Sequence, residues 1–168
     1  MSDEGLPDEG PIEQLFLRSA PAALRLAFLL TGDAHLAEDV TQEAFIRVAG
    51  RFGHLRSASS FDAYLRRTVV NLCTSQFRRR KVERAYLERE ARRSAVNVDP
   101  PNVGEHEELR SALRALPPRQ RAAVVLRYYE DLSERQTGEA LGISAAAVRS
   151  LVLRAMTTLR ERVRRDES

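Results

Sequence analysis

Apolar residues recur every three or four positions along most of the chain, which is the period of an α-helix. The first such pattern covers residues 11–30, and Pro21 predicts a break or kink within it. A second pattern follows Asp33, a residue type that often caps a helix, and a third extends from about Phe61 to about Arg93. No stretch of useful length alternates with period two. The pattern therefore predicts an all-α fold.

Residues 94–106 interrupt the helical patterns and divide the chain. This stretch, SAVNVDPPNVGEH, holds two consecutive prolines, which cannot continue a helix. We therefore expect two small helical domains, residues 11–93 and 107–168, joined by a flexible linker. Residues 1–10 are acidic and are expected to form a disordered tail.

Beyond the linker, the sequence predicts four short helices with breaks at 117–118, 130–133 and 142–144. Ser133 is suited to cap one helix and Ser144 the next. The turn LGI between them is typical of a helix-turn-helix, which presents its second helix to the major groove of DNA. A helical hairpin that only packs, or one that binds protein, would show the same spacing.

The second helix of this motif separates into two faces. One face is expected to be buried and holds Val148, Val152, Ala155 and Met156. The other is expected to meet DNA and holds Arg149, Ser150, Leu153 and Arg154. Leu153 on that face could contact a thymine methyl group. Leu151 belongs to neither face.

Composition excludes several classes of protein. The chain has 168 residues, 43% of them hydrophobic, which is enough to build real cores. Its single Cys73 excludes an internal disulfide and is expected to be a buried apolar residue. The three histidines are scattered and no glycine-rich phosphate loop is present, so we expect no catalytic residues, metal or cofactor. No apolar run is long enough to cross a membrane, which favours a cytoplasmic protein.

The net charge of +3 conceals two basic blocks. Residues 76–93 carry eight bases and three acids, and residues 149–165 carry six bases and one acid. Two separated blocks favour two contacts with a polyanion, although each could also be an ordinary solvated face.

Two segments together resemble the extracytoplasmic-function sigma factors, which are compact members of the sigma-70 family. LLTGDAHLAEDVTQEAFIRVA followed by FDAYLRRTVVNLCTSQFRRR is similar to their domain 2. LRALPPRQRAAVVLRYYEDLSERQTGEALGISAAAVRSLVLRAMTTLRERV is similar to their domain 4. The resemblance implies an alternative sigma factor that binds core RNA polymerase and directs transcription from specific promoters. It also implies an anti-sigma partner, often anchored in the membrane.

AEDVTQEAFIRV matches the family helix that docks on the largest subunits of the polymerase. The resemblance assigns this contact to Asp39, Gln42, Glu43 and Ile46. Offsets of 0, 3, 4 and 7 place these four residues on one helical face. That face differs from the apolar stripe of Leu36, Ala37, Val40, Ala44 and Val48.

FDAYLRRTVVNL matches the helix that opens the −10 promoter element and holds its non-template strand. Unpaired bases need stacking surfaces and phosphates need positive charge. The resemblance therefore implies a stacking role for Tyr64 and an amide contact from Asn71, and residues 52–60 would form a wall of the pocket. The remaining −10 contacts that it implies are Phe61, Arg66, Arg67 and Arg78. Phe61 and Tyr64 could equally be core residues.

The resemblance implies that Arg149, Ser150, Leu153 and Arg154 read the −35 element. Arg127, Arg135 and Arg160 would contact phosphates. The chain departs from the family at Leu151, where a base is common, and at Thr137-Gly138, where an apolar residue and alanine are common. Tyr64 stands in place of a frequent tryptophan and Ser75 in place of a frequent aspartate. These departures leave the promoter sequence open.

The two promoter elements of the family lie roughly 15–20 base pairs apart, or about 50–70 Å at ~3.4 Å per pair. Two domains of about 25–30 Å on an extended linker of up to ~40 Å would span this gap. The account would be contradicted by two halves fused into a single compact body with Asn71 and Arg149 both buried in it. The main alternative is a stand-alone helix-turn-helix regulator that dimerises on a palindrome, and it leaves residues 11–93 without a role.

Overall fold

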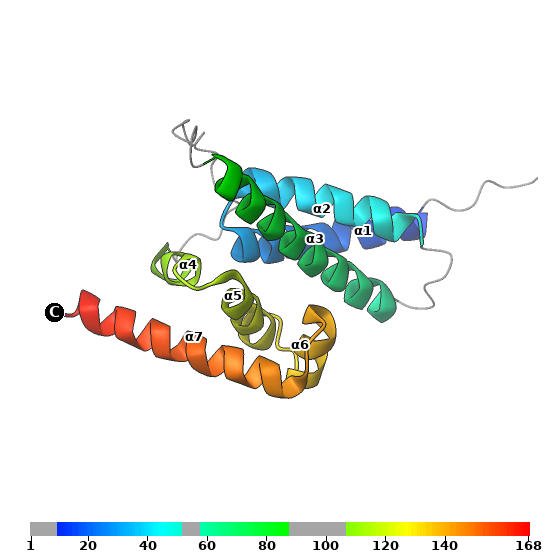
Figure 1. Ribbon diagram of the computed structural model, residues 1–168. Coiled ribbons are helices and arrows are strands. Elements are labelled where there is room, and N and C mark those ends of the chain that lie inside the picture. The colour runs from blue at the N-terminus through cyan, green and yellow to red at the C-terminus, as the bar shows by residue number, and fades with distance from the viewer. Residues whose placement is uncertain (1–9, 52–57, 88–106) are drawn as a thin grey trace, which may run out of the picture.

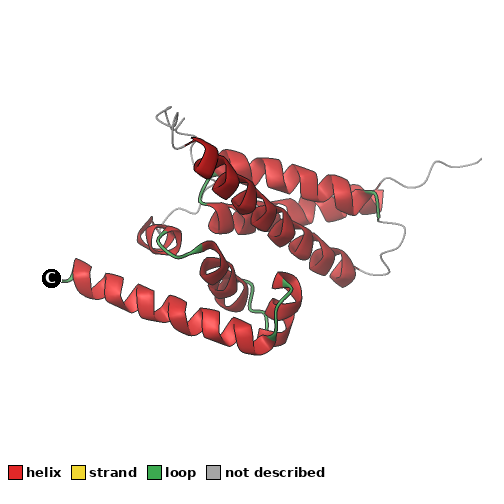
Figure 2. Ribbon diagram, in the orientation of Figure 1, coloured by secondary structure: helices red, strands yellow, loops and turns green. Residues whose placement is uncertain are grey.

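The computed structural model describes residues 10–51, 58–87 and 107–168. Within these ranges it contains helices and no strand, as Figures 1 and 2 show, and the predicted all-α fold is confirmed. The predicted tail over 1–9, the 52–57 part of the predicted pocket wall and the linker 94–106 lie outside the described residues. The helices are α1 (Gly10–Thr31), α2 (Ala34–Ala49), α3 (Ala58–Leu87), α4 (Glu107–Arg114), α5 (Pro118–Val124), η2 (Val125–Tyr129), α6 (Glu134–Leu141) and α7 (Ala145–Asp166).

Helices α1, α2 and α3 pack against one another and form the N-terminal half of the molecule (Figure 1). The start of α2 is fixed locally, because the side chain of Asp33 accepts a hydrogen bond from the amide of Leu36 at 3.0 Å. The predicted apolar stripe of α2 is buried throughout. Alanines such as Ala37 and Ala44 are fully buried there, and their small side chains let the helices approach closely. The remaining face of α2 stays outside the core.

Of the break or kink expected at Pro21, the break is contradicted, and the kink stays a prediction. Helix α1 runs from Gly10 to Thr31 as one α-helix with Pro21 inside it. The proline ring itself is exposed, whereas Ala23 and Leu26 in the following turn are buried against the other helices. Tertiary packing therefore holds the helix together across a residue that removes one backbone donor.

The C-terminal half comprises α4 to α7, and its helices end where the sequence predicts breaks. Pro118 occupies the first turn of α5, where a missing amide hydrogen costs nothing. The chain leaves α5 through the π-helical turn η2 and reverses at Asp131, whose φ of 53° lies in the left-handed region. This reversal places Glu130 and Tyr129 toward the N-terminal half, where they contact Arg66 and Arg25.

The two halves are in contact, and Figure 1 shows α4 to α7 lying along one side of α1 and α3. Arg121 is central to this contact and is only 6% exposed. Its guanidinium donates to the carbonyl oxygens of Leu30 at the end of α1 (2.8 Å) and of Leu113 near the end of α4 (2.9 Å). Burial lowers the pKa of Arg121 from its usual value. One arginine thus satisfies helix-end carbonyls in both halves.

Candidate nucleic-acid interface

A pocket of about 600 Å³ lies between the end of α2 and the middle of α3. Three residues predicted to contact the −10 element, Tyr64, Arg67 and Asn71, line it together. Offsets of three and four place them on one face of α3. The other lining residues are Ile46, Arg47, Gly50, Arg51 and Thr68. The helix therefore gathers an aromatic ring, an amide and a positive charge around one hollow.

Two arginines of this pocket, Arg47 and Arg51, were not predicted from the sequence. The guanidinium of Arg51 lies over the ring of Tyr64, 5.9 Å from its centroid, within the range of a cation–π contact. Arg47 pairs with Glu43 at 2.7 Å. Arg47 lies in the last turn of α2 and Arg51 just beyond its end, and only the packing of α2 on α3 brings them to the pocket. The sequence does show basic residues at the end of a predicted helix, but this pattern does not indicate which residues they contact.

The remaining −10 candidates occupy other surroundings. Phe61 is 3% exposed and its ring lies 6.5 Å from that of Phe45, so it belongs to the core. We therefore withdraw Phe61 as a DNA contact, because a buried ring offers no face for stacking. Arg66 pairs with Glu130 of the other half at 2.9 Å. Arg78 is exposed and follows Asn71 by two helical turns, on the same face of α3.

The predicted docking face of α2 is separate from its buried stripe. Asp39, Gln42 and Ile46 are exposed and Glu43 is half-buried. Ile46 has 68% of its surface exposed. Because Ile46 also lines the pocket, the docking face and the pocket adjoin.

The helix-turn-helix is built as the sequence predicts. Ser133 and Gln136 form a capping box at the start of α6, and Gly142 ends α6 in the left-handed conformation. Helices α6 and α7 meet at 97°, within the range typical of this motif. Gly138 permits their close approach, because a Cβ there would lie 2.6 Å from the carbonyl oxygen of Ile143.

Helix α7 projects the residues that were predicted to face DNA. Val148 and Ala155 are fully buried, and Val152 and Met156 are partly buried beside them. Arg149, Ser150, Leu153 and Arg154 are all exposed. Leu151, unassigned by the sequence, is half-buried.

Arg149 is braced by a carboxylate before any DNA binds. It pairs with Glu134 of α6 at 2.8 Å. Hydrogen bonding to Arg149 holds the pKa of Glu134 below its usual range, and the same contact raises the pKa of Arg149. Asn71 is also exposed, so neither Asn71 nor Arg149 is buried in the apolar core that the two halves share.

The arginines expected at phosphates differ from one another. Arg127 donates to the carbonyl oxygen of Leu132 and is partly buried, so it supports the turn. Arg135 is exposed and pairs with Glu139 at 3.2 Å, and Arg160 is exposed. Only the last two are placed as phosphate contacts would be.

Cys73 is buried, as the sequence predicts, and burial raises its pKa to about 12. Among the described residues, no group of His, Cys, Asp and Glu is arranged to hold a metal ion. In the same ranges, no single helix is both long and apolar enough to cross a membrane.

These features define a helical protein in two parts, in which a polar pocket belongs to one part and a helix-turn-helix to the other. Sigma-70 region 2 matches residues 15–83, and Sigma-70 region 4 matches residues 106–159. The RNA polymerase sigma-E factor of Streptomyces avermitilis is 37% identical over 140 residues, which cover 83% of this chain and 78% of that protein. The ECF RNA polymerase sigma factor SigE of Mycolicibacterium smegmatis is 34% identical over 93% of this chain and 63% of that protein.

The fold is also shared with solved structures. The sigma factor RpoE of Bartonella quintana, solved in complex with the anti-sigma factor NepR, has a TM-score of 0.75 at 24% identity, with 92% of this chain and 97% of that chain covered. The chain belongs to the sigma-70 family, in its extracytoplasmic-function group. It is thus an alternative sigma factor, a transcription initiation factor that directs RNA polymerase to promoters.

Proposed function

We propose that this sigma factor reads the −10 element with the pocket between α2 and α3, and the −35 element with the exposed face of α7. Residues 11–93 act as domain 2 and residues 107–168 as domain 4. The observation that carries the proposal is the convergence of Tyr64, Arg67 and Asn71 on one hollow that also holds unpredicted arginines. An ordinary solvated face would not bring a ring, an amide and several cations to one cavity.

Within the pocket, each side chain has a distinct role. Tyr64 offers a stacking face to an unpaired base, and Asn71 hydrogen-bonds to its edge. The guanidinium of Arg51 lies over the same ring, 5.9 Å from the ring centroid. A flat base needs about 3.4 Å on each of its faces, so a small outward movement of Arg51 would accommodate a base between the two. Arg67 and Arg78 provide charge for the strand backbone.

The docking face of α2, which we define as Asp39, Gln42, Glu43 and Ile46, binds the largest subunits of the core polymerase. Its combination of an exposed aliphatic side chain with acids suits a partner that buries apolar surface and supplies cations. Charge reversal at Asp39 combined with Gln42→Ala is expected to weaken core binding without changing the helicity of the free chain. Titration against core polymerase and circular dichroism measure the two quantities.

The polymerase supplies the chemistry, and this chain supplies promoter choice and strand opening. An anti-sigma protein is the expected regulator, since the sigma factor RpoE of Bartonella quintana was solved in complex with the anti-sigma factor NepR. We place the chain in the cytoplasm, where an anti-sigma partner could hold it at the membrane.

A pull-down on core polymerase, followed by run-off transcription from promoter DNA, tests the proposal. The chain is expected to bind core and to start transcripts at defined positions. If core does not bind and the free chain protects a palindrome, the stand-alone regulator is the correct interpretation.

A further inference from the structure

Part of the contact between the halves is polar, where α1 and α3 meet the turn after η2. Arg66 of α3 and Glu130 of the turn after η2 form an ion pair at 2.9 Å. Their side chains are only 28% and 16% exposed, so the pair is partly shielded from water. Tyr129, the residue before Glu130, accepts a hydrogen bond from Arg25 of α1 at 3.1 Å. Two adjacent residues of one half thus hold arginines of the other.

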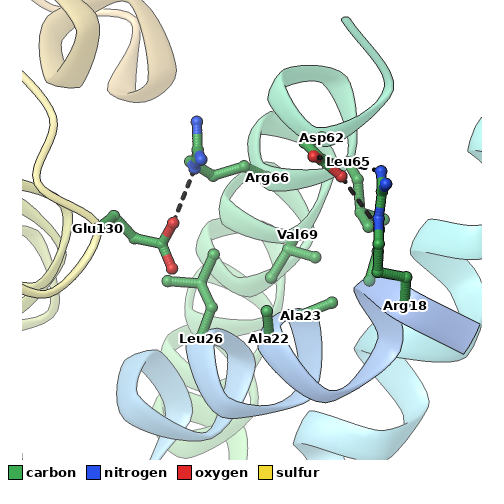
Figure 3. Close-up of a pocket in the computed structure, with 10 residues that line it drawn as sticks. Arg18, Ala22, Ala23, Leu26, Asp62, Leu65, Arg66, Val69 and Glu130 are labelled. Carbon is green, nitrogen blue, oxygen red and sulfur yellow. Dashed lines mark hydrogen bonds and ion pairs between the residues drawn. The ribbon is translucent and has the colours of Figure 1, made fainter. Parts of the chain in front are cut away.

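A cavity of about 280 Å³ lies beside this ion pair, between α1, α3 and Glu130. Figure 3 shows Arg66 and Glu130 facing each other at one end of it, with Arg18 and Asp62 at the other end. The apolar side chains of Leu26 and Val69 line it as well. The halves are therefore incompletely packed at this point, although one apolar core joins them elsewhere and includes Leu116 and Leu126 of the C-terminal half.

The same turn also limits how far apart the two reading regions can be. Glu130 holds Arg66, and Glu134, four residues later, holds Arg149. Four residues span at most about 14 Å, and two extended ion pairs add roughly 28 Å to the distance between the arginine Cα atoms. Arg66 and Arg149 are thus within roughly 40 Å, which is less than the ~50 Å gap between promoter elements. The closed arrangement therefore holds the Cα atoms of the two arginines closer together than the two promoter elements lie.

We propose that the Arg66–Glu130 ion pair is a latch that keeps the two halves closed, and that Arg66 exchanges Glu130 for the DNA backbone when the halves separate. The inference rests on the proposed function, because it treats Arg66 as a −10 contact. In the closed chain, the carboxylate of Glu130 pairs with the guanidinium of Arg66 as a DNA phosphate would. This guanidinium is therefore not available to DNA until the halves separate. Opening leaves Arg121 three of its four carbonyl partners, those of Leu113, Arg114 and Leu116.

Fluorescence transfer between α3 and α6 reports the opening, because these helices are in contact across the halves. Dyes are attached to Ala63→Cys and Glu139→Cys, both exposed positions, and buried Cys73 stays unlabelled. The free chain is expected to give high transfer, and promoter-bound holoenzyme low transfer. Glu130→Gln in the free chain is expected to raise the ratio of open to closed molecules about five- to tenfold.

A second readout separates a latch from a merely structural contact. When the closed state dominates, DNA affinity rises with the open fraction, so Glu130→Gln should tighten binding of the free chain about five- to tenfold. The probe is a duplex that carries both elements of a promoter identified by transcript sequencing. Arg66→Gln should open the chain equally but give no such gain, because it also removes the DNA contact. Glu108→Gln, carried by the same labelled chain, removes a charge from an exposed α4 residue and should change neither signal.

The charge-swapped pair Arg66→Glu with Glu130→Arg should restore high transfer without restoring DNA affinity. Two results would overturn the latch: transfer unchanged by Glu130→Gln, or high transfer retained in a promoter-bound holoenzyme. If run-off transcription fails while transfer still responds to Glu130→Gln, the promoter assignment is wrong and the intramolecular contact stands.

Discussion

The two regions that we propose to read the promoter, called the reading regions below, are built in opposite ways. The first is a hollow between two helices, lined by Tyr64, Asn71 and several arginines. The second is the exposed face of a single helix, whose Arg149 is braced from α6 by Glu134. A hollow with a ring and an amide suits a base that has left the duplex, whereas a projecting helix suits the groove of an intact one. The difference matches strand opening at one element and duplex recognition at the other.

The two halves also differ in how completely their buried polar side-chain atoms are hydrogen-bonded. Among the described residues, the buried side-chain atoms that lack a hydrogen-bond partner all lie in the C-terminal half: Arg110 Nε, Gln120 Oε1 and Thr137 Oγ1. In the N-terminal half, buried Thr41 donates to the carbonyl oxygen of Ala37 at 2.7 Å. Because an unpartnered buried polar atom is costly, we expect the C-terminal half to be locally less stable.

The largest expected effect comes from the duplex-reading helix. Replacement of both Arg149 and Arg154 by alanine should reduce −35-dependent binding by about 100-fold or more, since each good base contact contributes about 1–3 kcal/mol. Affinity for core polymerase should be unchanged. Titration of holoenzyme on promoters with and without the −35 element measures the first quantity, and core titration measures the second.

The matched control for that variant replaces Arg135 and Arg160 instead. These exposed residues are placed for phosphates, so their loss should weaken binding to all sequences and flatten its salt dependence. A parallel loss of core affinity in the Arg149 and Arg154 variant would contradict the separation of the two halves by function.

Substitutions in the pocket between α2 and α3 should affect a different step of transcription initiation, the formation of the open complex. Asn71→Ala is expected to reduce open-complex formation about tenfold and closed-complex formation much less, because only an extruded base reaches the amide. Arg51→Ala should act in the same direction with a smaller effect. Permanganate reactivity of unpaired thymines reports the open complex. Ser75→Ala, exposed on α3 outside the pocket, is the control, and an equal loss at both steps would argue against a strand-opening role.

Local signals in the sequence predicted the fold and the helix-turn-helix well. Asp33, Ser133 and Ser144 each cap the helix expected of them, because a cap depends on residues two or three positions away. The faces of α7 followed from helical periodicity alone. Gly138 meets a local steric need as well, because a Cβ there would lie 2.6 Å from the carbonyl oxygen of Ile143.

Features that depend on distant packing were not predictable. Phe61 could not be placed in the core from its neighbours, and the continuity of α1 through Pro21 depends on burial against α2 and α3. The partner of Arg66 lies 64 positions away. The contribution of Arg51 to the pocket likewise required the packing of α2 on α3.

This difference in the hydrogen bonding of buried hydroxyls can be tested with a matched pair of substitutions, one in each half. Thr137→Val should raise the free energy of unfolding by about 1 kcal/mol, because it removes an unpartnered buried hydroxyl. Thr41→Val should lower it by a similar amount, since that hydroxyl is satisfied. Urea denaturation followed by circular dichroism measures both. Destabilisation by both substitutions would show that Thr137 has a partner after all.

The smallest effect is expected for the ion pair between Glu134 and Arg149, which we call the brace. Glu134→Gln should reduce discrimination at the −35 element about threefold and slightly raise general DNA affinity, because it frees Arg149 and removes an acid near phosphates. The lowered pKa of Glu134 means that the pairing is complete above the usual pKa of a glutamate and is lost only as pH falls through the lowered value. Discrimination by the unmodified protein should therefore stay constant between about pH 5 and pH 8. A decline within that range would contradict the brace.

The account is tested most directly by sequencing the 5′ ends of transcripts made by core polymerase with this chain. Start sites should share two upstream elements at a fixed separation. The variant with alanine at both Arg149 and Arg154 should lose selection for the −35 element. Asn71→Ala should weaken strand opening at the −10 element. Start sites that share only one element, or that do not change when α7 is altered, would contradict reading by two regions.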